Sequence, residues 1–145
     1  MIRALRPQLS LYEPPPVFSS RELPVSFVIL GETPSKKNSK RLIVVKGRTI
    51  PISSKHYEAW RKAALKQIEW EEGPLRSEVA IEITIFAGTR RAGDLTNKAE
   101  SVMDLLVEKK VLVDDNWFIV PAVTLMFGGV DRFRPRAEVV ISQKL

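Results

Sequence analysis

Acidic side chains at both ends of one predicted helix are the residues of this chain best suited to hold a metal ion. Asp94 lies in the sequence Gly-Asp-Leu-Thr-Asn at residues 93–97. Asp114 and Asp115 come after the apolar residues that recur at helical spacing beyond it. Mg²⁺ prefers oxygen ligands and is usually held by a few carboxylates together with water and substrate oxygens. In a chain otherwise rich in cations, the acids suggest a metal site that faces a polyanion.

Helical spacing adds Glu100 to the candidate ligands. Thr96 and Glu100 are four residues apart and share one face of the helix, with Asp94 just before that face. Each residue also has an ordinary explanation, because Asp94 or Thr96 could cap the helix and Glu100 could be a solvated surface residue. Asp114 and Asp115 could likewise form an acidic turn. A helix of about 15 residues is more than ~20 Å long, so spacing alone does not bring Asp115 back to Asp94.

Cations lie on both sides of these acids in the sequence. The segment from Pro34 to Arg48 has six Lys or Arg residues and no acid, and the whole chain has a net charge of +6. Such a surplus favours nucleic acid or an acidic surface as a partner, although a charge run is often only a solvated loop. Ser and Asn side chains alternate with the cations and also bond phosphate oxygens. The predicted DNA-binding residues are Lys36, Lys37, Asn38, Lys40, Arg41, Arg90, Arg91 and Lys98.

The elements that must position these residues are short strands and two main helices. The sequence predicts an α/β domain of the two-layer α+β kind with a small mixed β-sheet. Its expected elements are a strand at 25–30, a hairpin of 42–45 and 49–52, a helix from Ser53 or Ser54 to Gly73, a strand at 79–86, a helix from 95 or 96 to 110, a strand region at 117–120 and 123–127, a turn at Gly128-Gly129, and a last strand at 137–141.

The composition bounds the function. Residues 1–24 form a proline-rich arm that could dock on its own domain, dock on a second subunit or be a disordered tail, and residues 25–145 form the domain. The absence of cysteine excludes thiolate catalysis and fits a reducing cytoplasm. His56 is the only histidine, and its place in the first turn of a helix favours a surface residue. No apolar run approaches the roughly 18 residues that span a bilayer, so no membrane partner is expected.

The acidic motif resembles the signature of the RusA family of Holliday junction resolvases. That family has an Asp-Leu-Asp-Asn sequence, a helix and an Asp-Asp pair, which correspond here to residues 94–97, a helix that contains Asp104, and Asp114-Asp115. The resemblance extends over about residues 25–141 and includes the Pro34-Ser35 to Asn38 stretch.

The resemblance implies a small homodimeric endonuclease, cytoplasmic and encoded by a bacterium or phage. It would cut four-way DNA junctions with symmetric nicks in recombination and repair, using Mg²⁺, or Mn²⁺, held by aspartates. Asp94 matches the first catalytic aspartate and Asp115 the last. Asp114 is the other member of the Asp-Asp pair, and Asn97 matches the motif asparagine.

Two positions depart from the family pattern. Thr96 stands where the family has its second aspartate, and Glu100 stands where it has a lysine. Glu100 could supply the missing ligand, and Arg90, Arg91 or the Lys36-Lys37 loop could supply the missing cation. The competing hypotheses are a DNA-binding module of the same fold that has lost efficient chemistry, and a Mg²⁺-dependent enzyme acting on a smaller phosphate ester.

Overall fold

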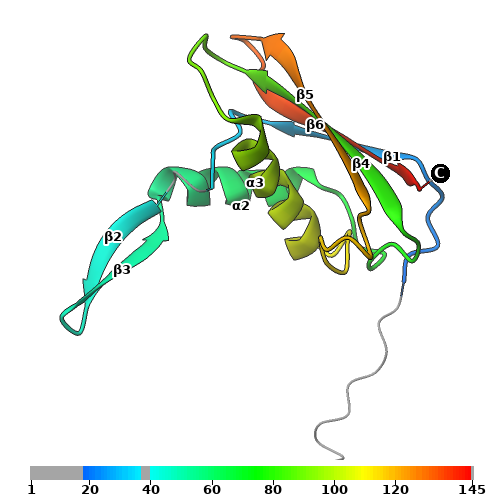
Figure 1. The fold of residues 1–145 in the computed structure, drawn as a ribbon, viewed down its shortest axis with the longest axis horizontal. Coiled ribbons are helices and arrows are strands. Elements are labelled where there is room, and N and C mark those ends of the chain that lie inside the picture. The colour runs from blue at the N-terminus through cyan, green and yellow to red at the C-terminus, as the bar shows by residue number, and fades with distance from the viewer. Residues whose placement is uncertain (1–17, 37–39, 145) are drawn as a thin grey trace, which may run out of the picture.

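The computed structural model describes residues 18–36 and 40–144, so residues 1–17 of the predicted arm, Lys37 and Asn38 lie outside the described part of the chain. The elements follow the predicted order (Figure 1). They are β1 (Val25–Leu30), β2 (Lys40–Val45), β3 (Arg48–Ser53), α2 (Lys55–Gln67), β4 (Val79–Ala87), α3 (Leu95–Glu108), β5 (Ala122–Val130) and β6 (Arg136–Gln143).

Four strands form a mixed sheet in the order β1-β6-β4-β5. β4 and β5 run parallel, with α3 between them in sequence, and the other neighbours are antiparallel. One face of the sheet carries Ile29, Ile81, Ile83, Val139 and Ile141, all buried. These residues share one core with the apolar faces of α2 and α3. The predicted two-layer architecture with a mixed sheet is therefore confirmed.

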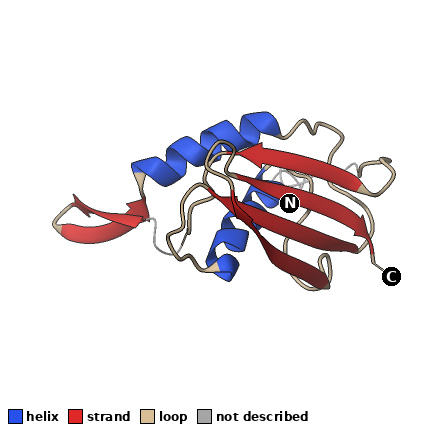
Figure 2. Ribbon diagram, turned by 90° about the horizontal axis from the view of Figure 1, so that it is seen from above, coloured by secondary structure: helices blue, strands red, loops and turns tan. Residues whose placement is uncertain are grey.

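The hairpin of β2 and β3 forms a sheet of its own and projects from the rest of the domain beside the start of α2 (Figures 1 and 2). Its turn contains Lys46 at φ 51° and Gly47 at φ 76°, the left-handed backbone that two-residue hairpin turns require. Lys40, Arg41 and Arg48 are exposed on its strands. The predicted hairpin is confirmed, and its cations are available to a partner.

Four predicted elements differ from the structure. Helix α2 has the expected cap, Ser54, but ends at Gln67, well before Gly73. Residues 117–120 are not a strand, because the Asn116 side chain accepts hydrogen bonds from the amides of Phe118 and Ile119 and closes a turn. Gly128 and Gly129 do not end a strand either: β5 continues to Val130 with a shift of register between Ile85 and Phe86 of β4. The helix α3 also ends at Glu108, two residues before the predicted Lys110.

The described end of the predicted arm lies on the domain. The Ser19 amide donates to the carbonyl of Pro74 at 2.7 Å, and Arg21 pairs with Glu72 at 3.2 Å. His56 is exposed, as predicted. Among the described residues, no helix has the length and apolar content needed to cross a bilayer.

Candidate functional site between α3 and β5

Asp94 begins α3 as its N-cap. Its Oδ1 accepts hydrogen bonds from the amides of Thr96 at 3.0 Å and Asn97 at 3.4 Å, and from the Thr96 hydroxyl at 2.7 Å. A carboxylate here satisfies amides that a helix start leaves without partners, and it lies at the positive end of the helix dipole. Of the two predicted caps, the structure therefore has Asp94, and it ties Asp94 directly to the Thr96 side chain.

The chain turns back beyond the far end of α3 and brings Asp115 to the side of the helix. The amides of Val111 and Leu112 both donate to the carbonyl of Leu106. The side chains of Val111 and Leu112 are 0% and 2% exposed, so they anchor this segment in the core. Asp115, three residues later, then lies on the same side of the helix as Glu100, where the sequence alone could not place it.

A groove of about 450 Å³ runs between α3 and the first half of β5. Thr96, Glu100 and Asp104 line it at intervals of four residues along one face of the helix, and Asp115 lines it from the loop. The whole lining is Lys36, Thr96, Ala99, Glu100, Met103, Asp104, Asp115, Val123 and Leu125. Asp94 is not part of this lining, but its Oδ1 accepts a hydrogen bond from the hydroxyl of Thr96, which is part of it. The structure thus brings Asp115, Glu100 and Thr96 to one groove.

Asp104 is a site residue that the sequence reasoning named only as part of the family pattern. Its spacing of four from Glu100 and eight from Thr96 was the signal that could have placed it on the same helix face. Its carboxylate pairs with the Lys36 ammonium at 2.5 Å.

Helix α3 itself holds Lys36 in place. The buried Ser101 hydroxyl donates to the carbonyl of Pro34 at 2.8 Å, and the Lys98 ammonium donates to the carbonyl of Thr33 at 2.7 Å. These two bonds fix the segment that carries Lys36 over Asp104. Lys98 therefore has a structural partner inside the protein, whereas Lys36 is the cation that faces the acids.

Electrostatics distinguishes the two acids of the Asp-Asp pair. Desolvation in the groove raises the pKa of Asp115, and a hydrogen bond with Asp114 and the negative charge of Asp104 raise it further. The Asp115 amide donates to Asp114 and lowers the pKa of that carboxyl, which does not line the groove. The hydrogen bond to Asp104 raises the pKa of Lys36. Asp115 thus has a carboxylate whose negative charge is disfavoured by its neighbours, and a bound cation would relieve that repulsion.

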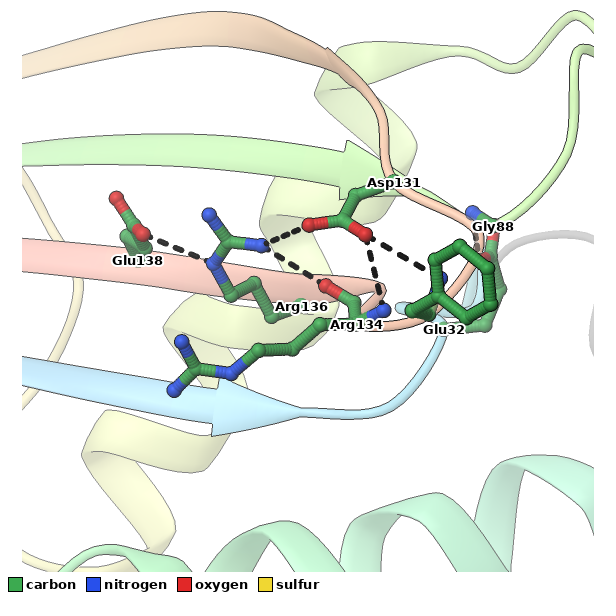
Figure 3. A network of polar contacts seen from close by, with 7 residues as sticks. Glu32, Gly88, Asp131, Arg134, Arg136 and Glu138 are labelled. Carbon is green, nitrogen blue, oxygen red and sulfur yellow. Dashed lines mark hydrogen bonds and ion pairs between the residues drawn. The ribbon is translucent and has the colours of Figure 1, made fainter.

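The loop with Arg90 and Arg91 starts from a braced end of the sheet, and both arginines are exposed. Figure 3 shows the bracing network, in which Arg136 bridges Asp131 and Glu138, each at 2.9 Å. The Glu32 side chain accepts a hydrogen bond from the Gly88 amide at 2.6 Å, directly before the loop (Figure 3). The loop therefore leaves the sheet from a fixed point.

The oxygen ligands in the groove fit Mg²⁺, which proteins usually hold with only one or two carboxylates. Within residues 18–36 and 40–144, no group of three or more His, Asp or Glu side chains is arranged to hold a metal. Asp115 and Glu100 nevertheless offer hard oxygen ligands in one groove, and one or two carboxylates suffice when phosphate oxygens and water complete the shell.

Comparison with known proteins gives no relative: no family model matches the chain, and no curated protein matches it.

Proposed function

We propose that the protein is a Mg²⁺-dependent, structure-selective endodeoxyribonuclease that acts as a homodimer and resolves four-way DNA junctions by paired symmetric nicks, in recombination and repair. The observation that supports this function best is the groove where Glu100, Asp104 and Asp115 gather beside Lys36. An acidic groove in a chain of net charge +6 favours a metal-assisted reaction on a polyanion.

Each groove residue has a role in this proposal. When bound, Mg²⁺ supplies neutralisation of phosphate charge and activation of a water. Asp115 and Glu100 would hold the ion, and Glu100 would accept a proton from the attacking water. Lys36 stabilises charge on the phosphate in place of the lysine that the motif lacks. The Thr96 hydroxyl is oriented by Asp94, which makes Asp94 a positioning residue for the helix start.

The cations outside the groove bind the DNA backbone. Lys40, Arg41 and Arg48 lie exposed on the projecting hairpin, and Arg90 and Arg91 lie exposed on the braced loop. Contacts of this kind give affinity without sequence information, and they weaken steeply as salt rises. A four-way junction offers a two-fold arrangement of strands that a homodimer with one groove in each protomer matches.

A cleavage assay tests the proposal. The protein is given a labelled synthetic four-way junction, and in parallel a linear duplex of the same arm sequence, with Mg²⁺ or Mn²⁺. Paired nicks in the junction and an intact duplex are expected. Equal cutting of both DNAs would contradict junction selectivity, and no cutting of the junction would contradict the nuclease.

The second candidate is a junction-binding or DNA-binding protein with weak or no chemistry. The observation that favours it is that Thr96 replaces a motif aspartate while no group of three acids forms a metal site among the described residues. A salt-sensitive shift of the junction without nicks, unchanged in Asp94→Asn, would support this candidate.

A further inference from the structure

β5 is an edge strand with properties that proteins usually avoid at an edge. It pairs with β4 on one side, and on its other side the described part of the chain places no strand. Its sequence from Ala122 to Val130 is Ala-Val-Thr-Leu-Met-Phe-Gly-Gly-Val, with no charge and no proline. An edge of this length and composition is a template for pairing with another strand, because its outer amides and carbonyls lack partners in the sheet.

At the opposite edge of the sheet, the end of β1 has hydrogen-bond partners from α2. The Gln67 side chain of α2 accepts a hydrogen bond from the Leu30 amide at 2.7 Å and donates one to the Leu30 carbonyl at 3.2 Å. Phe27 of β1 also packs against the Trp70 ring. Helix α2 and Trp70 thus contact β1, which has two buried residues, Val25 and Ile29, whereas β5 has none.

Exposed apolar side chains concentrate at the β5 edge. Met126 is 47% exposed and Phe127 is 60% exposed, on opposite faces of the strand. The loop before β5 adds Trp117 at 76% and Phe118 at 73%, and the loop after it adds Phe133. The full set in β5 and its flanking loops is Val113, Trp117, Phe118, Val123, Met126, Phe127, Val130 and Phe133. Exposed apolar side chains on an uncharged edge strand favour an interface over a solvated surface.

We propose that β5 pairs antiparallel with β5 of a second copy of this chain, so that one eight-stranded sheet runs through the dimer. A second copy fits because the edge is uncharged along its whole length, and two such edges meet about a two-fold axis without a like-charge contact. Antiparallel pairing of two edges places the axis perpendicular to the sheet. Both helical layers then lie on the same side.

The pairing has a consequence for the site. Val123 and Leu125 belong to β5 and also line the groove, so each groove lies next to the axis and the two grooves face the same way. The proposal builds on the homodimer of the proposed function, but it is tested without DNA or metal. A dimer that Met126→Lys leaves intact would rule out the β5 edge alone, whereas a monomeric wild type would also contradict the homodimer of the proposed function.

Sedimentation of the full chain tests the pairing. The wild-type protein is expected to be a dimer. Met126→Lys, at the centre of β5, is expected to raise the dimer dissociation constant by roughly 100-fold, because it places two lysines beside the axis and removes the apolar contacts of both methionines. The control is Val44→Lys, since Val44 is 72% exposed and lies on the hairpin, which forms a sheet separate from that of β5. A monomeric wild type, or dissociation by Val44→Lys but not by Met126→Lys, would overturn the proposal.

A second test does not depend on how Met126→Lys folds. The chain has no cysteine, so Met126→Cys and Val44→Cys each introduce a single thiol. Directly opposed residues in an antiparallel pair lie about 5 Å apart, which a short bismaleimide spans. Covalent dimers from Met126→Cys and none from Val44→Cys are expected. The reverse result would rule the β5 edge out.

Discussion

At the residue scale, Asp115 is the carboxylate whose surroundings point most clearly to a cation. Its pKa is raised by desolvation, by Asp114 and by Asp104, while Asp114 next to it has a lowered pKa. A site that raises the pKa of a carboxyl gives up stability when that group ionises, and function is a common reason for such a cost.

Replacing Asp115 by asparagine should stabilise the folded protein at neutral pH. The raised pKa means that the contribution of Asp115 to stability is fully present below the ordinary value of 3.8 and is lost as pH rises through the folded-state pKa. Thermal unfolding from pH 3 to pH 7 should show Asp115→Asn melting higher than wild type at pH 7, with the difference shrinking toward the acid end. A wild type that melts higher at pH 7 would contradict the assigned repulsion.

Saturating Mg²⁺ should instead make wild type melt higher than Asp115→Asn at pH 7, since a ligand of the folded state stabilises it by mass action only where the binding site is intact.

Glu100→Gln should abolish metal-dependent nicking, with a loss of about 100-fold or more, because the amide neither ionises nor accepts the proton of a water. The matched control is Glu71→Gln, an exposed glutamate outside the groove. Rates are measured on the junction with Mg²⁺ in excess. Undiminished nicking by Glu100→Gln would remove Glu100 from the site and leave Asp115 with another partner.

At the scale of elements, α3 carries the acids on one side of the groove and also holds the loop that ends in Lys36. Thr96, Glu100 and Asp104 project from one face, and Ser101 on the buried side bonds the loop that ends in Lys36.

Ser101→Ala should therefore lower both stability and activity. The loss of a buried hydrogen bond costs about 1 kcal/mol and leaves the carbonyl of Pro34 without its donor. Urea unfolding measures the stability, and nicking under conditions where the variant is fully folded measures the activity. Ser26→Ala, on the exposed side of β1, is the control and should change neither. An active, fully folded Ser101→Ala would show that the position of Lys36 does not depend on this bond.

The hairpin should contribute phosphate contacts. Removing Lys46 and Arg48 together is expected to reduce the slope of log affinity against log salt by about 2 for each protomer. Lys62→Ala with Lys66→Ala removes the same charge from the exposed surface of α2 and should leave the slope nearly unchanged. Equal effects of the two double variants on the slope would show that net charge, not the hairpin, sets the binding.

Sequence periodicity predicted the strands and helices that have one buried face. It did not predict the ends of elements that depend on particular side-chain contacts. The alternation of Val79, Ile81 and Ile83 and the apolar stripe of α2 both place residues in the core as expected. Gly128 looked like a turn residue, but a Cβ there would lie 2.5 Å from the Phe86 ring, so the glycine lets that ring pack against a continuing strand. The position of Asp115 depended on the buried Val111-Leu112 anchor, which spacing alone does not reveal.

At the scale of the whole molecule, the candidate DNA-binding cations and the acids of the groove lie on different surfaces. Exposed cations lie on the projecting hairpin and the braced loop, and Glu100, Asp104 and Asp115 line one groove beside the uncharged edge of the sheet. In the proposed dimer both grooves face the same side, and the arrangement presents two acidic sites within a cationic surface to a two-fold DNA.

The most direct test of this account is the rate of nicking of a four-way junction by wild type and by Asp115→Asn under single-turnover conditions with Mg²⁺. Wild type is expected to make paired nicks, and Asp115→Asn is expected to nick about 1000-fold more slowly. Both proteins are expected to bind the junction with similar salt dependence. Nicking by Asp115→Asn at the wild-type rate would contradict this account.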